Sequence, residues 1–126
     1  MARLEHANIT VGDADHTAGW LGRAFGWSVM WQGPVSKGDG RTVFVGNGHE
    51  YLALFEPAHS DAGDRDQWKT RGRVNHIGIV VEDLGAAETA ITGEGYTPHA
   101  HHDYEPGKRF YFFDDNDIEF EIVCYD

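Results

Sequence analysis

Near the start of the chain, apolar and polar side chains alternate over six positions, with Ala7, Ile9 and Val11 between His6, Asn8 and Thr10. This period of two is typical of a strand with one apolar face. Helical spacing follows, because apolar residues recur at Ala14, Leu21, Ala24 and Phe25. Asp13 or Asp15 can cap that helix, and Gly26 can end it.

The same pattern occurs a second time. LEHANITVGD, which starts at Leu4, aligns without a gap on VNHIGIVVED, which starts at Val74, at a shift of 70 positions. RTVFV (41–45) aligns on RFYFF (109–113), and LALF (52–55) aligns on FEIV (120–123), both at a shift of 68. Self-similarity at a fixed spacing indicates two copies of one structural unit.

Each copy predicts a strand, a helix and three further strands. In the second copy Asp83 can cap a helix that Gly93 or Gly95 ends, with an apolar stripe at Leu84, Ala87, Ala90 and Ile91. Strands are predicted at 27–32 and 96–102, and hairpin turns at GNG (46–48) and DDND (114–117). The fold class expected is α+β, with two βαβββ modules in a curved mixed sheet, a cup with helices outside.

We expect a single domain that covers residues 1–126, made of module 1 (1–57), a connector (58–73) and module 2 (74–126). The connector is polar and has no period, and a short helix near Trp68 fits its composition. A chain of this length suffices for one buried core.

Composition narrows the functional classes. The formal charge is -11, from 21 acidic and 10 basic residues, which disfavours nucleic acid as a partner. Apolar runs are too short for a membrane span, and the one cysteine, Cys124, excludes an intrachain disulfide. We expect a soluble protein in the cytoplasm.

Strand parity predicts which side chains share a surface. If His6 points away from the helix, Asn8 and Thr10 do so as well, and the repeat gives His76 the same direction. On the last hairpin the matching face carries Arg109, Tyr111, Phe113, Glu119, Glu121 and Val123. A curved sheet would gather these side chains, and His102 precedes them on the neighbouring strand.

This duplicated unit, with a histidine in the first strand of each half and a glutamate in the last strand, resembles the vicinal oxygen chelate superfamily. That superfamily includes glyoxalases, extradiol dioxygenases, fosfomycin-resistance thiol transferases and bleomycin-binding proteins. The resemblance implies a divalent metal held by His6, His76 and Glu121. Ala53 stands where the family has a fourth ligand, and two histidines with one carboxylate form a facial triad that suits Fe(II). Glu56 has the wrong parity to replace it, while Glu119 shares the parity of Glu121.

The stretch from His102 to Glu121 resembles the extradiol dioxygenase signature at His102, Phe110, Tyr111, Asp114 and Glu121, and departs from it at Ala100, Asp115 and Asp117. The resemblance implies that His102 and Tyr111 orient a catechol-like substrate and that His59 is an acid–base residue. Asn8 is expected to contact substrate, and Arg109 or Lys108 to hold a substrate carboxylate.

Alternatives stay open. Another metal-assisted enzyme of the fold, such as a lyase, isomerase or thiol transferase, would use Mn(II), Zn(II) or Ni(II), whereas a bleomycin-resistance-like binding protein would need no metal and would use tryptophan surfaces.

Tyr111 can also simply pack among phenylalanines. His99 and His101 are expected to be solvated, with a weak metal cluster at 99–102 as the alternative. DDND fits a turn better than a calcium loop. By analogy with small relatives, we expect a homodimer.

Overall fold

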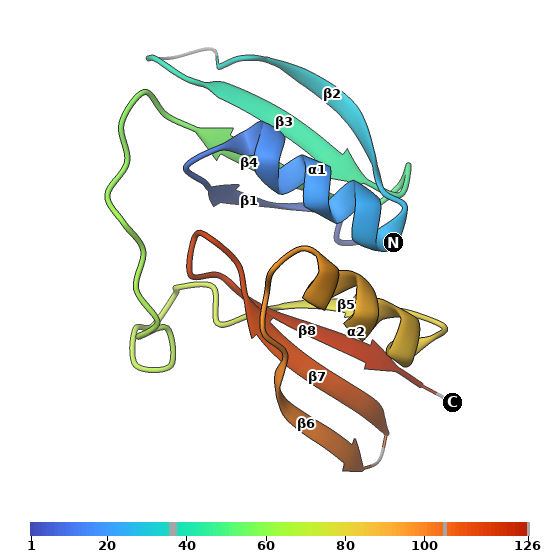
Figure 1. Ribbon diagram of the computed structural model, residues 1–126. Coiled ribbons are helices and arrows are strands. Elements are labelled where there is room, and N and C mark those ends of the chain that lie inside the picture. Colours follow the sequence, from blue (N-terminus) through green and yellow to red (C-terminus); the bar gives the residue numbers. More distant parts are fainter. Residues whose placement is uncertain (36–37, 105, 126) are drawn as a thin grey trace. The chain divides into compact units, whose positions relative to one another are not determined.

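A computed structural model describes residues 1–35, 38–104 and 106–125. The first half contains β1 (His6–Thr10), α1 (Ala14–Phe25), β2 (Ser28–Pro34), β3 (Arg41–Gly46) and β4 (Tyr51–Glu56). The second contains β5 (Ile77–Val80), α2 (Leu84–Gly93), β6 (His99–Tyr104), β7 (Gly107–Phe113) and β8 (Glu119–Cys124) (Figure 1). The predicted α+β fold with two βαβββ modules is confirmed.

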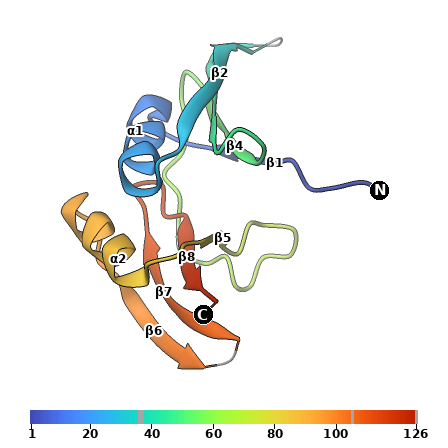
Figure 2. The same cartoon turned by 90° about the vertical axis from the view of Figure 1, so that its right-hand side faces the viewer.

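The chain divides into two compact units, unit 1 (1–61) and unit 2 (62–126). Their four-stranded sheets have matching orders, β1-β4-β3-β2 and β5-β8-β7-β6. β1 runs parallel to β4, and β5 runs parallel to β8, whereas all other neighbouring strands are antiparallel. Within each unit, the helix lies along one face of its own sheet (Figure 2).

Both helices begin at the predicted aspartates. The side chain of Asp13 accepts from the backbone N–H of His16, and that of Asp83 accepts from Ala86, each at 3.0 Å. Asp15 instead pairs with Arg41. Gly26 ends α1 in the left-handed conformation at φ 73°, as predicted. At the end of α2, Glu94 is the cap, and Gly95 takes the positive φ of 96°.

The core of each unit comes from alternate positions on the central strands. In unit 2 the buried set is Phe110, Phe112, Phe120 and Ile122, and in unit 1 it is Val43, Val45, Leu52 and Leu54. Helix residues Ala87 and Ile91 are buried in unit 2. A slip of one residue would turn these side chains to the other face, so burial fixes the pairing register.

The register corrects one part of the repeat alignment. Phe44 pairs with Ala53 in unit 1, and Tyr111 pairs with Glu121 in unit 2. Because Ala53 corresponds to Glu121, Phe44 corresponds to Tyr111. The shift for this strand is therefore 67 rather than 68, and the predicted match of RTVFV with RFYFF was wrong by one residue.

The helix predicted near Trp68 is absent from the described connector. This segment forms turns instead, with backbone hydrogen bonds from Lys69 to Asp66 and from Arg73 to Thr70. Strands β2 and β6 also begin and end later than predicted.

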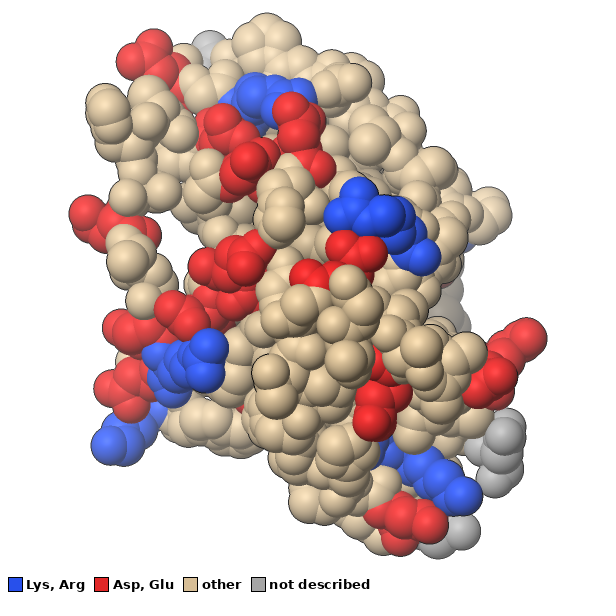
Figure 3. All heavy atoms as spheres, viewed as in Figure 1, with Lys and Arg blue, Asp and Glu red and all other residues tan. Residues whose placement is uncertain are grey.

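Charged side chains at the surface are often paired. Figure 3 shows acidic groups spread over the visible face, with basic groups beside them. Arg41 contacts Asp15 at 2.9 Å, and Arg73 contacts Asp64 at 2.6 Å. Neither helix in the described part of the chain combines the length and apolarity that crossing a membrane requires.

The turn between β7 and β8 is organised by Asp114. Its Oδ1 accepts from the backbone N–H groups of Asn116 and Ile118, both at 2.9 Å, and Asp117 takes a positive φ of 57°. Burial raises the pKa of Asp114 above its ordinary value, although these hydrogen bonds lower it. The predicted turn is confirmed, and both Asp114 oxygens accept hydrogen bonds inside it.

We predict that Asp114→Ala destabilises the protein by about 1–3 kcal/mol, because two backbone donors at a buried turn lose their acceptor. Urea denaturation measures the free energy of unfolding. Asp61→Ala removes the same charge at an exposed position and should change it by less than about 0.5 kcal/mol. Equal effects of the two substitutions would contradict the role given to Asp114.

Candidate metal centre

Unit 2 presents a polar surface on the side of its sheet that faces away from the buried phenylalanines. The register pairs Arg109 with Val123, Tyr111 with Glu121 and Phe113 with Glu119. Paired residues of an antiparallel ladder lie on the same face. We call these six residues the Tyr111 face, whose membership the sequence parity predicted.

The carboxylate of Glu121 lies at the centre of the Tyr111 face, and its two oxygens have different partners. Oε2 accepts from the Tyr111 hydroxyl at 2.8 Å and from Arg109 Nη1 at 3.0 Å. Oε1 lies 3.5 Å from His76 Nε2. Burial raises the pKa of Glu121, but the hydrogen bonds from Tyr111 and Arg109, with the nearby His76, leave it lower than its ordinary value.

His76 is oriented by the residue before it. Its Nδ1 lies 2.8 Å from Oδ1 of Asn75, an acceptor, so Nδ1 carries the proton. In the neutral form of the ring the lone pair is then on Nε2, the nitrogen that faces Glu121 Oε1. Two lone-pair donors that face each other favour a cation between them. Two ligands about 2.1 Å from one ion would lie roughly 3.0–3.5 Å apart, so this pair fits a divalent metal.

His6 has the same arrangement in unit 1. Its Nδ1 lies 2.9 Å from Oε1 of Glu5, which corresponds to Asn75 in the repeat. The ring stacks on Tyr51 at 5.0 Å between centroids. Outer partners of this kind commonly fix the orientation of metal-binding histidines, and here too Nε2 is the nitrogen left for a metal.

The position that corresponds to Glu121 in unit 1 holds Ala53, which pairs with Asn8 of β1 and is buried. Its methyl group cannot bind a metal. Glu56 accepts from the backbone N–H of Ala14 at 2.7 Å, at the start of α1. Glu56 therefore lies on the helix side of the sheet, as its parity predicted.

Within the described residues of either unit, no group of three histidine, cysteine, aspartate or glutamate side chains gathers as a metal site. A site made of His6, His76 and Glu121 would take ligands from both units, and it stays a prediction. The alternative cluster at 99–102 is divided between two faces, because His101 contacts Glu88 of α2 at 2.8 Å.

A bulge in β6 decides which histidines reach the Tyr111 face. His99 pairs with Tyr111 and His102 with Arg109, so two residues of β6 lie opposite one residue of β7. Ala100, in the bulge, has a positive φ of 53°. As a result both His99 and His102 lie beside the Tyr111 face, and the His102 ring stands edge-on to Tyr111 at 6.3 Å.

Two other predicted residues lie elsewhere. His59 is exposed in unit 1, beside Thr10 at a cavity of about 340 Å³. Lys108 pairs with Cys124, with parity opposite to that of Arg109, and lines a cavity beside the start of α2. Of the two cations expected to hold a substrate carboxylate, only Arg109 belongs to the Tyr111 face.

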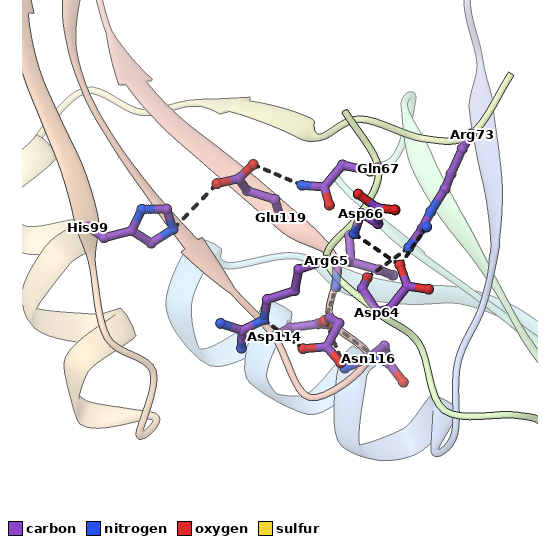
Figure 4. A network of polar contacts seen from close by, with 11 residues as sticks. Asp64, Arg65, Asp66, Gln67, Arg73, His99, Asp114, Asn116 and Glu119 are labelled. Carbon is purple, nitrogen blue, oxygen red and sulfur yellow. Dashed lines mark hydrogen bonds and ion pairs between the residues drawn. The ribbon is translucent and has the colours of Figure 1, made fainter. Parts of the chain in front are cut away.

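The structure also shows a polar cluster that the sequence did not reveal. Glu119 Oε1 accepts from Gln67 Nε2 at 3.1 Å, and its Oε2 lies 3.4 Å from His99 Nε2 (Figure 4). Glu119 and Gln67 are only 5% and 4% exposed. No sequence signal indicates Gln67, because the connector has no period, and parity alone places His99 and His102 on opposite faces.

The sequence matches the family model of the Glyoxalase/Bleomycin resistance protein/Dioxygenase superfamily over residues 3–122. The chain belongs to this superfamily. The resemblance drawn from the sequence is therefore confirmed at the level of the family. Among curated proteins, none matches the chain at a significant level.

Solved structures share the fold at low sequence identity. A glyoxylase/bleomycin resistance protein/dioxygenase domain from Frankia sp. EAN1pec has a TM-score of 0.83 and 19% identity, with 100% of this chain and 99% of that chain covered. Trypanothione-dependent glyoxalase I from Leishmania major has a TM-score of 0.80 and 21% identity, with 99% and 88% covered. The fosfomycin resistance protein FosX from Listeria monocytogenes has a TM-score of 0.72 and 16% identity, with 98% and 93% covered.

We predict that Tyr111→Phe raises the pKa of Glu121 in the metal-free protein toward its ordinary value, because the carboxylate loses a hydrogen-bond donor. A carboxylate whose pKa is lower in the folded state than in the unfolded state stabilises the protein at pH values above the unfolded pKa. This stabilisation is lost as the pH falls through the folded pKa. The difference in stability between wild type and Tyr111→Phe should therefore shrink at acid pH.

Carbonyl-detected NMR titration measures the Glu121 pKa, and denaturation at several pH values measures the stability difference. Tyr96→Phe is the matched control, because the Tyr96 hydroxyl donates to Asp115 instead. A Glu121 pKa that is unchanged in Tyr111→Phe would contradict the contact.

Proposed function

We propose that the protein is a divalent-metal-dependent enzyme, an extradiol-type Fe(II) dioxygenase acting on a catechol-like substrate. His6, His76 and Glu121 are its metal ligands. The observation that carries the proposal is the facing pair of His76 Nε2 and Glu121 Oε1, whose other polar atoms already have partners. This pairing prepares one nitrogen and one oxygen for a shared cation.

The ligand set favours iron. Two histidines and one carboxylate leave three positions of an octahedral ion open on one side, and Ala53 supplies no fourth ligand. A divalent iron bound there would accept both a bidentate diol and dioxygen. Mn(II), Zn(II) and Ni(II) are the metals expected for other enzymes of this fold, and metal analysis distinguishes them.

Side chains of the Tyr111 face have separate tasks in this proposal. Burial and the neighbouring Glu121 raise the pKa of Tyr111 to about 12, so its phenol remains a donor at neutral pH. That donor and Arg109 hold Glu121 Oε2, which leaves Oε1 for the metal. Arg109 also provides positive charge for a substrate carboxylate, and His102 borders Tyr111 as an orienting group.

Residues of the remaining surfaces complete the proposal. Asn8 lies two residues after His6 in β1, so both side chains are on the same side of the strand, and Asn8 would contact substrate. His59 is proposed as an acid–base residue and Lys108 as a second cation for the substrate. We propose a homodimer as the assembly, and cytoplasm as the location.

A non-enzymatic binding protein is the second candidate, and one observation favours it. Unit 1 carries an aromatic cluster in which the ring centroids of Trp31 and Phe44 lie 5.0 Å apart, and Phe44 stacks on Tyr51 with 4.5 Å between centroids. Trp31 is 48% exposed. An exposed indole ring beside a stacked aromatic pair suits a planar ligand without any metal.

We predict that wild-type protein purified without oxygen binds one Fe(II) per chain and that His76→Ala and Glu121→Gln each weaken binding at least about a hundredfold. Competition with a metal indicator measures the affinity. His101→Ala, on the other side of β6, is the control and should bind like wild type. If His76→Ala retained full metal binding, every metal-dependent function proposed for this site would be contradicted.

Turnover tests the reaction itself. Fe(II)-loaded protein, assayed in air against a panel of catechols, should form a coloured ring-fission product, and His76→Ala should form none. Bound iron with no product across the panel would contradict the dioxygenase and favour another enzyme of the fold. Absence of bound metal, with aromatic ligands retained, would favour the binding protein.

A further inference from the structure

Gly78 borders the proposed metal site without contributing a side chain to it. It lies in β5, two residues after His76 and two before Val80, so the three positions share one face of the strand. Gly78 pairs with Glu121 of β8 and is exposed. The glycine is therefore next to the same carboxylate that His76 faces.

The backbone conformation does not require glycine at this position. Gly78 is not among the glycines of the described chain that take a positive φ, so its backbone suits any L-residue. Glycine inside a strand is unfavourable, because it loses more chain entropy on folding and packs no side chain against its neighbours. The two residues after it, Ile79 and Val80, are of the β-branched type that strands prefer.

Packing within unit 2 does not require glycine either. A Cβ atom placed on Gly78 would lie 3.6 Å from Oε1 of Glu121, and among the described residues it would meet no other atom within 4 Å beyond its chain neighbours. At Gly107, by contrast, a Cβ atom would lie 2.5 Å from the backbone oxygen of Cys124, so close packing excludes a side chain there. Gly78 instead leaves open space beside Oε1 of Glu121.

The matching pair in unit 1 has the opposite distribution of side-chain size. Asn8 corresponds to Gly78, and it pairs with Ala53, which corresponds to Glu121. The scaffold thus accepts a side chain at this position of the first strand. Unit 2 omits it at the place where an imidazole and a carboxylate face each other.

The open space adjoins the carboxylate oxygen that is assigned to the metal. Oε2 of Glu121 accepts from Tyr111 and Arg109, whereas Oε1 faces Nε2 of His76 at 3.5 Å. A molecule that chelates a cation at this pair through two oxygens must also fit the atoms that join those oxygens. Glycine in a strand often marks a place where a ligand approaches the backbone closely. The space at Gly78 is therefore suited to the flat part of a chelating ligand.

We propose that Gly78 is a specificity-determining residue, whose missing side chain leaves room beside Oε1 of Glu121 for the ring of a planar, chelating substrate. The inference rests on the proposed function, because the metal brings the substrate to this position. It adds a condition on shape to that function. A ring-bearing diol needs the space at Gly78, whereas a small chelator with the same pair of oxygens does not.

Two chelating probes test the proposal on Fe(II)-loaded protein kept without oxygen, so that no turnover occurs. Catechol and acetohydroxamate both chelate through two oxygens, but only catechol has a ring, and calorimetry measures their affinities. In Gly78→Val, catechol should bind at least about tenfold more weakly, because side-chain atoms forced into filled space are as unfavourable as an overpacked core. Acetohydroxamate should keep its affinity within about twofold, since it does not reach the added atoms.

Two smaller substitutions complete the binding comparison. Gly78→Ala should give an intermediate loss for catechol, because it adds a single methyl group. Gly93→Ala is the matched control, because Gly93 is an exposed glycine of α2 at which an added Cβ atom meets nothing within 4 Å. This variant should bind both probes like wild type.

Metal affinity and stability distinguish the proposed role from a structural one. Competition with a metal indicator should show that both Gly78 variants bind Fe(II) like wild type. Urea denaturation should show Gly78→Ala to be at least as stable as wild type, because alanine has less chain entropy to lose on folding.

Equal catechol affinity in wild type and Gly78→Val, or iron binding without catechol binding by wild type, would overturn the inference and leave the metal site standing. Equal losses for the two probes, loss of iron from the variants or a destabilised Gly78→Ala would also overturn it, because the glycine would then serve the metal or the fold. A wild type that binds no iron would contradict the proposed function itself, and this inference with it.

Discussion

The pairing register of β7 and β8 is the constraint on which unit 2 depends. Phe110, Phe112, Phe120 and Ile122 are fully buried on one face, and a slip by one residue would expose them all. The same register places Tyr111 beside Glu121, and Glu119 beside Phe113. Hydrophobic burial therefore holds polar groups together on the opposite face, including a carboxylate that shares its oxygens between a phenol, a guanidinium and an imidazole.

The two units use one scaffold for different surfaces. At five matching positions unit 1 has His6, Trp31, Phe44, Tyr51 and Ala53, and unit 2 has His76, His99, Tyr111, Glu119 and Glu121. Only the histidine is common to both. Unit 1 supplies an imidazole within an aromatic surface, whereas unit 2 supplies carboxylates and hydrogen-bonding groups. The duplication thus repeats the backbone while the chemistry is concentrated in the second copy.

Local signals in the sequence predicted much of this architecture. Period-two alternation, the caps at Asp13 and Asp83 and the turn at Asp114 depend on neighbouring residues, and each is confirmed. The alignment of β3 on β7 failed by one residue because similar residue types hid a register that ladder pairing sets. The position of His99 beside the Tyr111 face could not be predicted, because a bulge changes parity and Ala100 gives no sign of a positive φ. Gln67 could not be predicted either, because it lies in a connector without any pattern and only tertiary contact buries it.

A crystal structure with a divalent metal tests the central claim most directly. The account predicts an ion about 2.0–2.2 Å from Nε2 of His6, Nε2 of His76 and Oε1 of Glu121. Oε2 of Glu121 should keep its contacts with Tyr111 and Arg109. An ion bound at Glu119 or in the 114–117 turn, with His76 and Glu121 left without metal, would contradict it.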